Sequence, residues 1–96
     1  MFNQTRAQLE ALKKSHDPIA IAHEHCSRHR AEIERSVRVG CFHCCEIYEA
    51  SLIDIWVGED DTALCTKCGI DAVIGDASGF PVTDRSFLKS MNKVWF

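Results

Sequence analysis

The chain has 96 residues, of which 46% are hydrophobic and 26% are charged, and its formal net charge is −3 at pH 7. This length fits one small domain with a thin hydrophobic core. The charge is uneven: residues 1–40 carry seven Lys/Arg against five Asp/Glu, giving +2, whereas residues 41–96 carry four against nine, giving −5. The acidic second half lacks the basic surface that binds phosphate backbones, which disfavours nucleic acid as a partner.

The residues also predict a compartment. No apolar run is long enough to span a membrane, and the start of the chain leads into a polar helical pattern without the apolar core of a signal peptide. We therefore expect a cytoplasmic protein with reduced thiols and no membrane partner. In that setting, six cysteines that include two C-x2-C pairs indicate a metal site rather than a disulfide framework.

Two amphipathic helices are predicted in residues 1–39. Apolar residues recur at helical spacing from Phe2 to about Ser15. Asp17 and Pro18 interrupt that pattern and suit the start of a second helix that runs to about Ser36. We expect the two helices to form an antiparallel hairpin that packs on the rest of the chain or forms a homodimer with a second copy.

Residues 40–96 are predicted to form a zinc-binding domain in one compact unit with the hairpin. Gly40 ends the helical part, and the two C-x2-C pairs enclose about 20 residues that can bring four thiolates to one point. Gly69 suits the turn after the last cysteine, because such a turn often needs a positive φ. The predicted ligands of one structural Zn2+ are Cys41, Cys44, Cys65 and Cys68.

Two neighbouring residues offer alternatives within this site. His43 could replace a cysteine as ligand, and Cys45 could compete with Cys44. Each C-x2-C pair is sufficient without them, so we expect His43 to be exposed or to contact a ligand, and Cys45 to face inward from a strand.

Short strands and a final helix complete the predicted order. Residues 45–50 read as a strand, residues 51–57 suit either a helical turn or a strand, and residues 62–64 return after an acidic turn. After the second cysteine pair come an apolar run at 70–74 and a loop at 75–79. Thr83 is the expected cap of a C-terminal helix. The fold class is small α+β.

A second set of polar residues could line a further site. His25 and His29 lie one helical turn apart, and Cys26 is spaced to join His29 in a second metal site. The alternative is that Cys26 is a small core residue and His29 is satisfied by a backbone carbonyl. A third interpretation is a polar patch that holds the two halves together or lines a small site. The residues in question are His25, His29, Arg30, Glu32, Asp71 and Asp76.

Four segments resemble a family of small, uncharacterised bacterial cytoplasmic proteins that bind zinc: His25–Ile33, Gly40–Cys44, Ala63–Gly75 and Phe87–Phe96. The most specific wording is C-x2-C…C-x2-C-G-I-D. The resemblance covers most residues from His25 onward, implies zinc binding, and carries no assigned reaction. At the level of fold, the order of knuckle, hairpin, knuckle and helix is similar to zinc-ribbon or treble-clef proteins.

These observations favour a non-enzymatic module that binds another protein. A closed four-thiolate site has no open position to activate water. A metal-dependent hydrolase or nuclease using His25, His29 and Asp71 is the alternative from the enzyme class, although the hairpin lacks the histidine base that treble-clef nucleases need. A nucleic-acid-binding regulator that uses Arg28, Arg35 and Arg38 is the third hypothesis.

Overall fold

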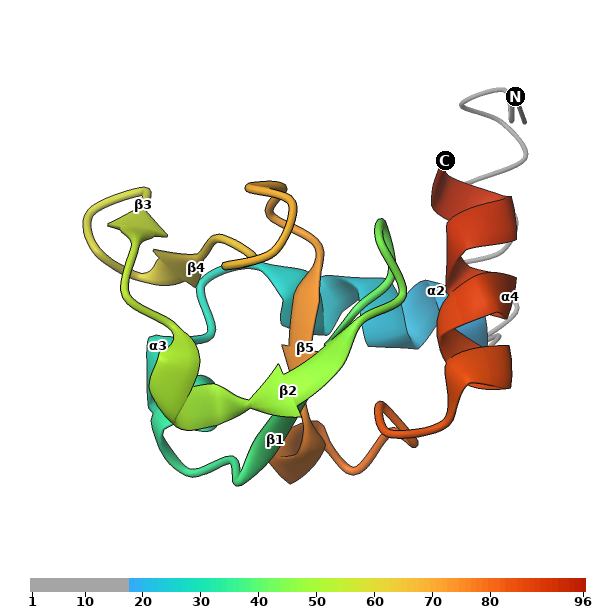
Figure 1. Cartoon of the computed structure of the whole chain (residues 1–96), viewed down its shortest axis with the longest axis horizontal. Coiled ribbons are helices and arrows are strands. Elements are labelled where there is room, and N and C mark those ends of the chain that lie inside the picture. Colours follow the sequence, from blue (N-terminus) through green and yellow to red (C-terminus); the bar gives the residue numbers. More distant parts are fainter. Residues whose placement is uncertain (1–17) are drawn as a thin grey trace.

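The computed structural model describes residues 18–96, and its centre is a three-stranded antiparallel sheet (Figure 1). The strands are β1 (Arg38–Cys41), β2 (Ile47–Glu49) and β5 (Val73–Gly75), in the order β2-β1-β5. Val39 pairs with Tyr48 on one side and with Gly75 on the other. The fold class is small α+β, as predicted. Its largest fully buried side chains are Phe42, Ile33, Ile74, Leu88, Met91, Val39, Val73, Val82 and Cys41.

β1 occupies a stretch that was predicted to end a helix. After the exposed Arg38, the remaining three residues of β1 are buried, as in a central strand, and pairing on both sides outweighs the local helical pattern. Position 40, in the middle of this strand, requires glycine because a Cβ there would clash with the carbonyl oxygen of Val82 and the side chain of Leu88. The predicted boundary between residues 39 and 40 falls inside β1.

A separate two-stranded ribbon joins the two cysteine pairs. It consists of β3 (Trp56–Val57) and β4 (Thr62–Ala63), and it follows the 3-10 helix η2 (Ala50–Leu52). Residues 51–57 therefore contain both of the predicted alternatives, a helical turn and then a strand. The ribbon lies at the opposite end of the molecule from the C-terminal helix (Figure 1).

The predicted second helix is broken into three pieces. These are α2 (Pro18–His23), the 3-10 helix η1 (Glu24–Cys26) and α3 (Arg30–Glu34). The break occurs because backbone N–H groups bond elsewhere: Arg28 donates to Thr62 Oγ1 at 2.9 Å, and His29 donates to the Asp61 carbonyl at 2.9 Å. A single helix to Ser36 is therefore wrong. The first predicted helix, and with it the hairpin and its dimer, lies outside the described residues.

The C-terminal helix α4 (Arg85–Trp95) packs beside α2 through a face that includes the fully buried Leu88 and Met91 (Figure 1). Its cap is Asp84 rather than the predicted Thr83. The Asp84 carboxylate accepts a hydrogen bond from the Ser86 N–H at 2.9 Å. Hydrogen bonds from Ser86 also hold the pKa of Asp84 below its usual value. The loop predicted at 75–79 contains the end of β5 and the short 3-10 helix η3 (Asp76–Ser78). None of the described helices is long and apolar enough to cross a bilayer.

Candidate metal centre

The two cysteine pairs lie in turns with the same backbone hydrogen bonds. In the first, the Cys41 N–H donates to the Glu46 carbonyl at 3.0 Å, and the Cys45 N–H donates to the Cys41 carbonyl at 2.8 Å. In the second, the Cys65 N–H donates to the Ile70 carbonyl at 3.0 Å. The Gly69 N–H then closes this turn onto the Cys65 carbonyl at 2.9 Å. Each turn is a knuckle that presents two sulfurs on one side.

The residue that follows each pair has a left-handed backbone. Gly69 has φ of 79°, as predicted, and Cys45 occupies the matching place in the first knuckle with φ of 61°. The prediction that Cys45 belongs to a strand is wrong, because β2 begins two residues later at Ile47. Its conformation closes the knuckle, and its side chain is half-buried.

The four sulfurs converge on one point, as predicted for Cys41, Cys44, Cys65 and Cys68. These atoms all lie within 4.8 Å of one another, and each knuckle contributes one buried and one half-buried cysteine. The Cys41 and Cys68 sulfurs are 3.7 Å apart, as are those of Cys44 and Cys65. Four thiolates around zinc at about 2.3 Å would lie about 3.8 Å apart, whereas a disulfide bond is about 2.05 Å long. The cysteines are positioned to bind a metal ion, most plausibly zinc.

Backbone and side-chain donors point at the sulfurs. The His43 N–H donates to Cys41 Sγ at 3.4 Å, and the Lys67 N–H donates to Cys65 Sγ at 3.3 Å. Two donors in equivalent places of the two knuckles stabilise the thiolate form, which is the form that binds metal.

Tyr48 contributes to the site although no sequence motif indicates it. Its buried ring lies on β2, and its hydroxyl accepts a hydrogen bond from the Thr66 N–H at 3.1 Å while bonding to Cys65. Burial raises the pKa of the Cys65 thiol, but hydrogen bonds from the Tyr48 hydroxyl and the knuckle backbone outweigh it and lower the pKa to about 7. Tyr48 therefore connects the sheet of the first knuckle to the second knuckle.

The pKa values of the two thiols of the first knuckle shift in the opposite direction. Burial raises the pKa of Cys41, and it raises the pKa of Cys44 to about 11. Because metal binding needs thiolates, loading the site must release protons from these cysteines.

Helix α4 supports the first knuckle from outside. Asn92 Nδ2 donates to the carbonyls of Phe42 and His43, at 3.0 and 3.1 Å. The Phe96 ring lies 5.6 Å from the Phe42 ring and 4.7 Å, edge-on, from the exposed His43 ring. Asn92 was missed as a supporting residue, because nothing in its sequence neighbours indicates which loop the helix will face.

His29 is buried, and both of its ring nitrogens have partners. Nδ1 lies 2.6 Å from the His25 carbonyl, so it carries the proton, and Nε2 accepts a hydrogen bond from the Ala63 N–H at 3.0 Å. Burial lowers the pKa of His29. This arrangement matches the alternative in which a backbone carbonyl satisfies His29. Among residues 18–96, the four-cysteine group is the one set of three or more His, Cys, Asp or Glu placed to hold a metal ion, so His25, Cys26 and His29 form no second such group.

The structure brings together three of the six polar candidates. His25, His29 and Glu32 line one hollow, whereas Arg30, Asp71 and Asp76 are not among its lining residues. His25 Nδ1 pairs with Glu32 at 2.9 Å, beside this hollow, which Arg28 and Arg35 also line. Arg30 pairs with Glu34 instead. Asp76 accepts hydrogen bonds from the N–H groups of Val37 and Arg38, at 3.0 and 3.1 Å, and so holds the start of β1. Asp71 is exposed near Cys26, whose pKa burial raises to about 11.

Comparison with models of known protein families, with curated proteins and with solved structures finds no match to this chain. The resemblance to bacterial zinc proteins stays a prediction, and the site is interpreted from its own geometry.

Proposed function

We propose that this protein is a zinc-ribbon-like adaptor, in which one structural Zn2+ holds the fold and the surface binds another protein. The observation that carries the proposal is the convergence of four sulfurs from two equivalent knuckles within 4.8 Å. Four thiolates fill a tetrahedral zinc shell, so the ion would build structure and leave no position for substrate.

The hydrogen bonds that already engage these polar candidates support a non-enzymatic role over the hydrolase or nuclease hypothesis. Both ring nitrogens of His29 are engaged, and the Asp76 carboxylate caps backbone N–H groups. A general base needs a free nitrogen or oxygen within hydrogen-bond reach of its substrate. Of these histidines, His25 keeps one ring nitrogen outside its pair with Glu32, but no nucleophile is hydrogen-bonded to it in the described residues.

Affinity purification of the tagged full chain from its native host tests the adaptor role. The control is Cys44→Ser with Cys68→Ser, which removes one ligand from each knuckle and should abolish the fold. We expect a protein partner that the zinc-loaded chain recovers reproducibly and the control does not. Recovery of nucleic acid in place of protein, or equal recovery by both chains, would contradict the proposal.

A further inference from the structure

The outer edge of β3 is open to a further strand. The Leu64 N–H donates to the Ile55 carbonyl at 3.0 Å, and Trp56 and Val57 pair with Ala63 and Thr62 of β4. In an antiparallel ladder this places the N–H and C=O of Ile55 and Val57 toward β4. The same groups of Asp54 and Trp56 therefore point away from β4, and within residues 18–96 neither residue makes a backbone hydrogen bond on that side.

The other edge of the ribbon is already covered. The Ala63 N–H donates to His29 Nε2, and the Asp61 carbonyl accepts the N–H groups of His29 and Arg30. The segment before α3 therefore takes the place of a strand beside β4. Only β3 offers the ribbon's free edge in the described part of the chain.

Large apolar side chains lie along this free edge. Leu52 is 50% exposed, Ile55 is 55% exposed and Val57 is 41% exposed. Ile55 and Val57 are two residues apart on an extended segment, so they share one face. The edge is short and has acidic neighbours, but it combines unpaired backbone with an apolar surface, which is the combination that accepts an added strand. We call residues 52–57 the β3 edge.

A groove lies beside the β3 edge and can receive side chains of an added strand. It has a volume of about 340 Å³ and includes Ile53, Trp56 and Ile33 among its lining residues. The Arg30 guanidinium lies over the Trp56 ring, 4.5 Å from its centroid, which holds the wall of the groove in place.

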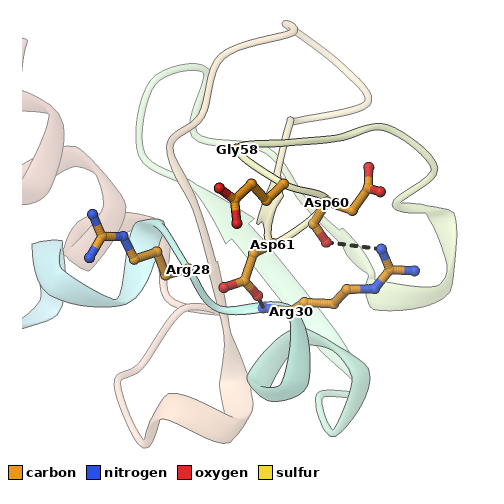
Figure 2. Close-up of a pocket in the computed structure, with 6 residues that line it drawn as sticks. Arg28, Arg30, Gly58, Asp60 and Asp61 are labelled. Atoms are coloured by element: carbon orange, nitrogen blue, oxygen red, sulfur yellow. Dashed lines mark hydrogen bonds between the residues drawn. The ribbon is translucent and has the colours of Figure 1, made fainter.

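The charge around the β3 edge is acidic. Asp54 lies on the edge, and Glu59, Asp60 and Asp61 form the turn that joins β3 to β4. Figure 2 shows this turn with Arg30, whose guanidinium donates to the Asp60 carbonyl at 2.9 Å. Arg30 is also paired with Glu34. The hollow at this turn is lined by three acidic residues and by the two arginines Arg28 and Arg30.

We propose that the β3 edge binds an extended segment of a partner protein as an added strand, and that this segment carries alternating apolar residues flanked by Lys or Arg. The backbone of Asp54 and Trp56 supplies hydrogen bonds, the groove takes side chains, and the acidic turn selects a basic segment. Two copies paired through this edge would each bring an acidic turn and Asp54 to the contact, and like charges disfavour self-association. The proposal rests on the adaptor function, for which it names the surface and the chemistry of the partner.

The test is an NMR titration of the zinc-loaded, 15N-labelled full chain with the capped peptide Lys-Val-Thr-Val-Thr-Val-Lys. We expect saturable shifts centred on the amides of Asp54 and Trp56. The peptide with Glu in place of Lys should bind at least about tenfold more weakly. A version with N-methylated alternate amides should cause no shifts, because it cannot pair as a strand.

Two variants separate the β3 edge from general charge effects. Ile55→Lys should weaken binding of the basic peptide by about tenfold, whereas Val37→Lys, which adds the same charge at another exposed apolar position, should change it less than about twofold. Equal effects of the two variants, or shifts centred elsewhere, would overturn the proposal. Concentration-dependent shifts of the edge amides without peptide would also overturn it, because they indicate that a second copy occupies the edge. Shifts of the same amides on deletion of residues 1–17 would overturn it as well, because they indicate that this segment occupies the edge. Retained recovery of a native partner by Ile55→Lys would refute the β3 edge and leave the adaptor function standing.

Discussion

At the scale of single residues, His29 illustrates how one side chain can join two segments. It links the carbonyl of His25 to the N–H of Ala63, which lie on different elements. Its neutral form with the proton on Nδ1 makes both bonds, and protonation of Nε2 would break the second. His29 is therefore expected to make folding sensitive to acid.

The pKa of His29 is lowered in the folded state from its ordinary value of 6.5, chiefly because burial penalises the charged ring. Below about pH 6.5 the unfolded chain binds a proton that the folded chain rejects. The stabilising contribution of His29 is thus present above that pH and is lost as the pH falls toward the folded-state pKa.

His29→Gln should remove this part of the pH dependence, because the amide oxygen can accept the Ala63 N–H without titrating. Urea unfolding of both proteins at about pH 7.5 and about pH 5.5 measures the difference. Acid also protonates the cysteines of both proteins, so the comparison between them isolates His29. An equal loss of stability in the two proteins would contradict this role.

The left-handed residues after the two cysteine pairs give a matched test at the same scale. Gly69→Ala should cost about 1–2 kcal/mol from backbone strain alone, because a Cβ at this position meets nothing within 4 Å. Cys45→Gly should relieve the same strain in the first knuckle, with a gain of at most about 1 kcal/mol, since glycine also makes the unfolded chain more flexible.

Thermal unfolding of the zinc-loaded variants checks both changes. Opposite signs are expected for the two changes in stability. Gly69→Ala adds a side chain at a position with a left-handed backbone, and Cys45→Gly removes one at the equivalent position of the other knuckle. Destabilisation by Cys45→Gly of more than about 2 kcal/mol would show that the Cys45 side chain is needed at the site.

At the scale of elements, the contact between α4 and the first knuckle depends on Asn92. Asn92→Ala leaves the carbonyls of Phe42 and His43 without their side-chain donor and should lower stability by about 1–2 kcal/mol. It should also weaken zinc binding, because the knuckle is less well ordered before the ion arrives. Competition with a zinc-binding dye measures the affinity. Unchanged zinc affinity and stability would show that α4 does not support the knuckle.

The sequence predicted those elements whose signal is local. Spacing identified the two cysteine pairs, Gly69 indicated a positive φ, and the apolar face of α4 indicated a terminal helix. It could not predict that the stretch after Pro18 breaks near Arg28, because the partners that break it, Asp61 and Thr62, lie more than 30 residues away. For the strand β1 the same reason applies to its pairing with β5, which is distant in sequence, but not to its pairing with the nearby β2.

The candidate site shows the same division. The four ligands follow from spacing alone, whereas Tyr48 and Asn92 act across the fold and carry no local motif. Cys45 could have been identified by comparing the two knuckles, because it stands where Gly69 stands in the second. Of the polar candidates, His25 bonds to both Glu32 and His29, whereas Arg30 and Asp76 have partners outside the set.

At the scale of the whole molecule, the metal site connects two cysteine turns that are otherwise held together only by short strands. The first knuckle connects β1 to β2, the second lies between β4 and β5, and each strand has only two to four residues. Structural zinc sites in small domains contribute on the order of 10 kcal/mol, comparable with the total stability of such a domain. Removal of the ion should therefore unfold the chain rather than loosen one loop.

The most direct test of the four-thiolate zinc site is the metal content of the purified full chain, measured by elemental mass spectrometry and followed by circular dichroism as a chelator removes the ion. We expect one zinc per chain, and loss of helical and strand signal as the zinc is removed, with recovery on adding it back. A chain that carries no stoichiometric zinc and keeps its fold in chelator would contradict the account.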